Sequence, residues 1–139
     1  MHVLVIENDR DIRDVVCCIL EDAQYVVLQA SHVSDGLRLA RLNPQIAVVL
    51  VDIHLGDRLT GLEILDALRS RLPRAQFVLI SGDWEALEKG VPNALTLRKP
   101  CGRIEVLEQV LHAVEVFKAN GGMESSSPVI RRQPRAMRR

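Results

Sequence analysis

Short runs of hydrophobic residues alternate along this chain with segments in which hydrophobic residues recur at helical spacing. The short runs predict strands, because they are brief, rich in β-branched residues and bounded by polar residues; they lie at residues 3–6, 25–29, 46–51, 77–80 and 94–97. An i, i+3, i+4, i+7 spacing predicts helices between them, at residues 12–20, 33–42, 61–72 and 102–117. The segment 84–89 is too short for more than a turn or two of helix.

The inner faces of the first and last helices can be predicted residue by residue. The stripe of the first helix comprises Ile12, Val15, Val16, Ile19 and Leu20. The stripe of the last helix comprises Ile104, Leu107, Leu111 and Val114. Pro44 and Pro73 end the second and third helices, because the residue before a proline avoids the helical region of backbone space.

The alternation of strands and helices predicts an α/β fold, a doubly wound five-stranded parallel sheet joined by right-handed crossovers. The first and third strands are nearly continuous hydrophobic runs, as expected when helices cover both faces of a sheet. Ligands of such sheets bind outside the carboxyl ends of the strands, where the winding direction reverses.

Polar side chains follow four of the predicted strands. The first strand runs into Glu7, Asn8 and Asp9, the third ends at Asp52, the fourth leads to Ser81 and Gly82, and the fifth leads to Lys99. Parallel strand ends share one edge of a sheet, so we expect these groups to form one site. A carboxylate at the end of a buried strand is costly unless another group compensates it. Asp9 also suits the N-cap of the following helix, and we expect that role ahead of a role as a ligand.

The composition predicts one domain and a basic tail. The chain has 139 residues, 47% of them hydrophobic, enough for a single core. Residues 1–118 carry 13 basic and 17 acidic side chains, a formal charge of −4, whereas residues 119–139 carry five arginines and Glu124, a charge of +4. The tail has too few hydrophobic groups to offset the entropy of ordering, so we expect it to be disordered.

The sequence also indicates the cellular setting. No stretch approaches the roughly 18 to 20 hydrophobic residues of a membrane helix, and the first residues lack the pattern of a secretory signal. Cys17, Cys18 and Cys101 do not form the framework of a disulfide-rich or metal-binding domain. We therefore expect a cytoplasmic protein with reduced thiols.

The order of elements, the acidic cluster after the first strand, Asp52, Ser81-Gly82 and Lys99-Pro100 together resemble the receiver domain of two-component response regulators. The resemblance covers roughly residues 1–117. It implies a flavodoxin-like sheet of order 2-1-3-4-5. It also implies that Asp52 is the phosphoacceptor, Ser81 the switch hydroxyl and Lys99 the phosphate-binding amine.

The same resemblance implies a Mg²⁺ ion next to Asp52. Its ligands would be Asp52, Glu7 directly or through water, a side-chain oxygen of Asn8 or, as a further candidate, Asp9, and the backbone carbonyl of His54. Mg²⁺ takes oxygen ligands and keeps several waters, and it would supply positive charge for phosphoryl transfer.

The chain departs from the family pattern at several positions. Asn8 stands where the family usually has its main metal-binding aspartate, so a negative charge is lost and Mg²⁺ affinity should fall. Gly56 replaces a frequent proline and Gly61 comes one residue late, which indicates a loop variant. The stretch between Ser81 and Lys99 is short, and Thr96 replaces a frequent switch aromatic.

We expect a stand-alone receiver that accepts a phosphoryl group from a histidine kinase or a histidine phosphotransfer protein and signals by contact with a downstream protein partner. Its phosphorylation and dephosphorylation chemistry would be auxiliary, so it is not classed as an enzyme. A homodimer stays open, whereas membrane and nucleic-acid partners are not expected.

Two other functions stay open at this stage. A phosphorylation-independent pseudo-receiver is favoured by Asn8. A small aspartyl-phosphate phosphatase is less favoured, because His54 stands where such enzymes place an acid/base aspartate. A dinucleotide enzyme is less favoured still, because no glycine-rich fingerprint follows the first strand.

Overall fold

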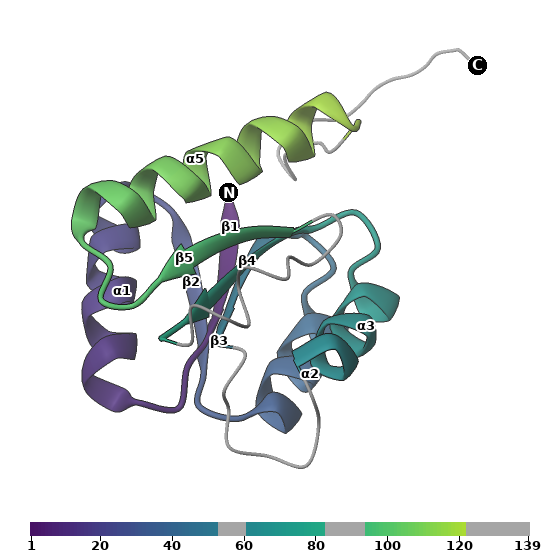
Figure 1. Ribbon diagram of the computed structural model, residues 1–139. Helices are drawn as coiled ribbons and strands as arrows, with labels where there is room; N and C mark the ends of the chain where they lie inside the picture. Colours follow the sequence, from purple (N-terminus) through teal and green to yellow (C-terminus); the bar gives the residue numbers. More distant parts are fainter. Residues whose placement is uncertain (53–60, 83–93, 122–139) are drawn as a thin grey trace.

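Five parallel strands form one sheet in the computed structural model, which describes residues 1–52, 61–82 and 94–121 (Figure 1). The order is β2-β1-β3-β4-β5, as predicted. The strands are β1 (His2–Ile6), β2 (Val26–Ala30), β3 (Ile46–Asp52), β4 (Gln76–Ser81) and β5 (Ala94–Arg98). Every residue of β3 is buried, whereas the edge strands β2 and β5 are partly exposed.

The helices cover both faces of the sheet. Helices α1 (Arg10–Asp22) and α5 (Arg103–Ala119) lie on one face, and α2 (Val33–Leu42) and α3 (Gly61–Arg71) lie on the other (Figure 1). Alternate residues of the strands point into the two layers: Val48 and Leu50 pack under α1 and α5, whereas Val49 and Val51 pack under α2 and α3. The doubly wound arrangement is therefore confirmed.

The inner faces of two helices differ from the prediction. In α5, Ile104 is 69% exposed and Leu111 is 53% exposed. Of the predicted stripe, Val114 is buried and Leu107 is partly buried. The buried residues of the helix are Val106, Val110, Ala113, Val114 and Phe117. In α1, Val15 is 58% exposed, while the residues after it form the contact with the sheet. Helix α5 has hydrophobic residues on more than one side. The spacing of these residues therefore does not show which side faces the sheet, and packing against the sheet determines it.

The strand register brings the polar strand ends together. Ile6 pairs with Val51, and Asp52 pairs with Ile80, so Glu7 follows β1 next to the end of β3. Ser81 pairs with Arg98, and the Lys99 backbone N–H donates to the Ser81 carbonyl over 2.9 Å. The carboxyl edge predicted from the sequence is confirmed.

Three predictions lie wholly or partly outside the described residues. These are the short helix at 84–89, the loop variant at 53–60 and most of the tail at 119–139. Helix α5 ends at Ala119, one residue beyond the predicted limit of the domain, and Arg74 donates a hydrogen bond to the Gly121 carbonyl. Among the described helices, none combines the length and the hydropathy that crossing a membrane requires.

We predict that Gly36→Ala destabilises the protein, because α2 packs very closely on β1 at this position. A methyl group on Gly36 would overlap Ile6 Cδ1 and lie 3.0 Å from Ile6 Cγ1, and Ile6 is fully buried. Overpacking typically costs about 1–3 kcal/mol, while alanine gains up to about 1 kcal/mol in helix propensity. We expect urea denaturation to give a net loss of about 1 kcal/mol.

The matched background for this test is Ile6→Val, which lacks the Cδ1 methyl. In that background Gly36→Ala should be neutral or stabilising, because the overlap is removed. Ser34→Ala on the exposed side of α2 serves as the control for helix propensity. An equal loss in both backgrounds would show that the contact with Ile6 is not the cause.

Candidate functional site

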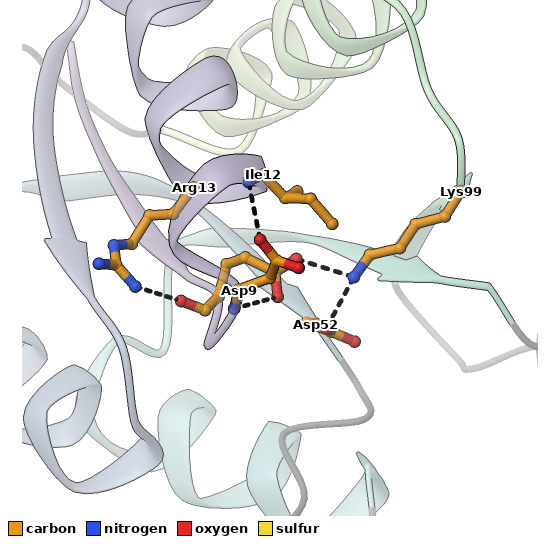
Figure 2. A network of polar contacts seen from close by, with 6 residues as sticks. Asp9, Ile12, Arg13, Asp52 and Lys99 are labelled. Atoms are coloured by element: carbon orange, nitrogen blue, oxygen red, sulfur yellow. Dashed lines mark hydrogen bonds and ion pairs between the residues drawn. The ribbon is translucent and has the colours of Figure 1, made fainter.

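Three charged side chains meet at the carboxyl edge of the sheet. The Lys99 Nζ atom lies 2.9 Å from Asp52 Oδ2 and 2.9 Å from Glu7 Oε1. The contact with Asp52 is an aligned hydrogen bond, whereas Glu7 Oε1 accepts no aligned hydrogen bond from the described residues. Figure 2 shows Lys99 extending from the end of β5 toward Asp52 at the end of β3. The structure thus brings together residues from β1, β3 and β5 that lie far apart in the sequence.

Burial sets the charge state of this cluster. The side chains of Glu7 and Asp52 are 1% and 4% exposed, and that of Lys99 is 23% exposed. Desolvation raises the pKa of Glu7, the nearby Asp52 carboxylate raises it further, and the Lys99 ammonium acts in the opposite direction. Desolvation lowers the pKa of Lys99, but its bonds to Asp52 and Glu7 outweigh that effect and leave the pKa raised. Lys99 is therefore a cation, and within the described part of the chain the cluster holds one cation for two carboxyl groups.

The loop between β1 and α1 is fixed by hydrogen bonds at both ends. Asp9 Oδ1 accepts from the Ile12 backbone N–H over 3.1 Å, so Asp9 is the N-cap of α1, as predicted. The Asp9 N–H donates to Glu7 Oε2 over 3.2 Å. Arg13 Nη1 donates to the Glu7 carbonyl over 2.8 Å, a contact drawn in Figure 2. Asn8 lies between these anchors and is exposed.

Two further predicted site residues are Ser81 and His54. Ser81 is fully buried at the end of β4, and its backbone carbonyl accepts a hydrogen bond from the backbone N–H of Lys99. The predicted metal contribution of the His54 carbonyl lies outside the described residues. Sequence reasoning missed Arg13. The available signal was an arginine placed one helical turn after the N-cap, where its long side chain can reach back to the strand end.

The donor set fits a Mg²⁺ ion that keeps much of its water. Two buried carboxylates, Glu7 and Asp52, face the same point, and Glu7 Oε1 has spare accepting capacity there. No group of three or more His, Cys, Asp or Glu side chains within the described residues could hold a metal ion. This agrees with Asn8 in place of an acid and with Asp9 acting as a cap. Mg²⁺ usually binds through one or two carboxylates, so the set is sufficient.

We predict that Glu7→Gln changes the pH dependence of stability. The pKa of Glu7 is raised in the folded protein, so the folded state favours the protonated carboxyl. The stability that this group contributes is present below the pKa of the unfolded chain and is lost as the pH rises through the raised pKa. Glutamine stays neutral throughout. In urea denaturation with a chelator present, the free energy of unfolding of Glu7→Gln relative to wild type should increase from about pH 4 to about pH 7.

Glu21→Gln is the matched control, because it makes the same chemical change at an exposed position of α1. Its stability relative to wild type should vary less with pH. A Glu7→Gln difference that stays flat over the same pH range would contradict the proposed cause.

Comparisons with known proteins agree with this geometry. The family model of the response regulator receiver domain matches residues 3–112. An NtrX-like response regulator of Rickettsia bellii is 33% identical over 83 residues, which cover 59% of this chain and 17% of the relative. The chain thus matches less than a fifth of that protein's length.

Two solved structures have the same fold. NtrX from Brucella abortus superposes with a TM-score of 0.75 at 28% identity, covering 86% of this chain and 28% of that one. A response regulator receiver domain protein from Clostridium thermocellum superposes with a TM-score of 0.74 at 26% identity, covering 86% of this chain and 98% of that one. The buried acid at the end of β3, its lysine partner and these likenesses lead to one conclusion: the chain belongs to the response regulator receiver family of two-component signalling.

Proposed function

We propose that Asp52 is the phosphoacceptor of this receiver domain. The observation that carries the proposal is the placement of Asp52 at the end of a fully buried strand, with its Oδ2 atom 2.9 Å from Lys99 Nζ. A buried carboxylate that is paired with an ammonium group at the carboxyl edge of a sheet is an arrangement of the kind found at functional sites. Phosphohistidine on a histidine kinase or a histidine phosphotransfer protein would be the donor.

The transfer needs little covalent help from the protein. An Asp52 carboxylate oxygen attacks phosphorus, the bond from phosphorus to the donor imidazole nitrogen breaks, and that nitrogen leaves as neutral imidazole or takes up a proton. Charge in the transition state lies on the equatorial phosphoryl oxygens, so positioning and positive charge lower the barrier. Lys99 is already in place to supply one such charge, and Ser81 is a candidate donor to a phosphoryl oxygen.

Mg²⁺ is the cofactor that receiver domains generally use, and we propose that Glu7 and Asp52 hold it here with Asn8 as a third ligand. The ion would supply positive charge that offsets the repulsion between the second carboxylate and the incoming phosphoryl group. The carbonyl of His54 stays a proposed ligand. Asp9 is less suited to that role, because one of its oxygens caps α1.

The signal would leave the domain as a change in affinity for a protein partner. A phosphoryl group carries roughly −1.5 to −2 charges and strong hydrogen-bond acceptors, and it replaces the single negative charge of the Asp52 carboxylate, so the net change is about −1. In this site the added charge would act on Lys99, which pairs with Asp52, and through Lys99 on the edge strand that precedes it. The existence of such a partner is part of this proposal, and so is any function that the longer relatives carry outside the matched region.

Asp52→Asn should abolish labelling by a small phosphodonor in the presence of Mg²⁺. The substitution keeps the shape of the side chain but removes the attacking carboxylate. Intact mass spectrometry of wild type and variant measures the result. The control is Asp11→Asn, which neutralises an exposed acid in the first turn of α1. Labelling of Asp52→Asn at wild-type stoichiometry, or no labelling of wild type at any Mg²⁺ concentration, would sink the assignment; the second outcome would point to a pseudo-receiver.

Asn8→Asp should tighten Mg²⁺ binding by about tenfold, roughly 1.4 kcal/mol. The change restores a negative charge next to two carboxylates in a partly solvated site. Calorimetric titration with Mg²⁺ compares the variant with wild type, and Asp11→Asn again controls for charge on the same loop and helix. Binding that is equal or weaker in Asn8→Asp would place residue 8 outside the metal site.

A further inference from the structure

Arg13 joins three elements at the edge of the site. It lies in the first turns of α1, and its Nη1 atom donates to the Glu7 carbonyl over 2.8 Å. Its Nε atom lies 3.3 Å from Gln29 Oε1, near the end of β2. Figure 2 shows the Arg13 guanidinium reaching back from the helix, while Lys99 approaches the network from the opposite side of the view.

Apart from Oε1, which pairs with Lys99 in the cluster, each polar group of Glu7 is held by a hydrogen bond to a neighbouring loop, strand or helix. Its backbone N–H donates to the Ala30 carbonyl over 3.0 Å, and its Oε2 atom accepts from Asp9. Its carbonyl accepts from Arg13, which leaves Oε1 directed at Lys99. The bond from Arg13 is the one anchor in this set that a side chain outside the loop supplies, so it alone can be removed by substitution with little change to the backbone path.

The geometry of an arginine suits this task better than that of a lysine. A guanidinium offers donors in a fixed fork, so it can bond to the Glu7 carbonyl and to Gln29 on a different strand at once. An ammonium is a point charge that can keep the charge without the fork. The charge itself opposes a nearby metal cation. A favourable effect of Arg13 on Mg²⁺ binding would therefore come from its geometry.

We propose that Arg13 is a positioning residue of the metal site: by fixing the Glu7 carbonyl and linking it to Gln29, it holds the loop of Glu7 and Asn8 in the conformation that binds Mg²⁺. This inference rests on the proposed phosphorylation function. Arg13 touches neither the ion nor the phosphoryl group. Residues that orient metal ligands in this way typically change metal affinity by 10- to 100-fold when they are replaced.

The test compares Arg13→Lys with Arg10→Lys. Arg10 lies on the same helix, and its side chain is 84% exposed in a loose 3.9 Å pair with Asp14. Both variants keep the charge, but only Arg13→Lys loses a guanidinium that bonds to Glu7 and Gln29. We expect calorimetry with Mg²⁺ alone to give about tenfold weaker binding for Arg13→Lys and a change within about twofold for Arg10→Lys. Phosphodonor labelling of Asp52 should need about tenfold more Mg²⁺ for half-maximal rate, with a maximal rate within about twofold of wild type.

Each outcome bears on the proposal. Mg²⁺ binding by Arg13→Lys as tight as wild type would overturn it, and so would a lowered maximal rate with unchanged Mg²⁺ dependence. Failure of Asp52 labelling in wild type would reject the proposed function, and calorimetry would still judge Arg13. If Arg13→Lys does not fold, Gln29→Ala takes its place, since Gln29 is exposed on an edge strand. About threefold weaker binding by that variant supports the proposal, and unchanged binding overturns it.

Discussion

Two carboxyl groups that have lost most of their water share one amine at the edge of the sheet, and this pairing governs the site. Glu7 and Asp52 each lie 2.9 Å from Lys99. Removing one partner of a buried ion pair typically costs about 3–5 kcal/mol, because it leaves an uncompensated charge. The strand order and register bring β1, β3 and β5 close enough for this pairing. The fold thus places charged side chains at a position where packed hydrophobic side chains would often give equal or higher stability.

The imbalance of one cation against two acids has a chemical use. Burial desolvates Glu7 and raises its pKa, the neighbouring Asp52 carboxylate raises it further, and the excess of acids leaves the site attractive to a further positive charge. Asn8 moderates this imbalance, since an amide in the exposed loop adds no repulsion to the two carboxyl groups and gives less attraction for a metal than an acid would. The hydrogen bonds of Asp9 and Arg13 hold the loop in position, so binding an ion there requires little new ordering.

Much of the fold and part of the site follow from local signals. Hydrophobic runs and helical spacing placed every described strand and helix within a few residues, and the polar residues at the ends of four strands predicted that Asp52 and Lys99 share one site. The inner face of α5 was wrong at Ile104 and Leu111, because a helix that is hydrophobic on several sides does not reveal which side meets the sheet. Arg13 was missed for another reason. Its position one helical turn after the N-cap was a signal, but its partners are a backbone carbonyl and a residue 16 positions away, which the sequence does not identify.

The position of β5 at the margin of the sheet has a mechanical consequence. Strand β3 is flanked by β1 and β4 and buried throughout, whereas β5 is paired only with β4 and is half exposed. Asp52 therefore stands on a strand that is paired on both sides and fully buried, and Lys99 follows a strand that lies at the edge of the sheet and is partly exposed. A change in the force between Asp52 and Lys99 would therefore displace β5, at the edge of the sheet, before it displaced β3, at the centre. Because α5 packs against β5 and follows it in the chain, such a displacement would reach the outer surface of the domain while the core stays in register.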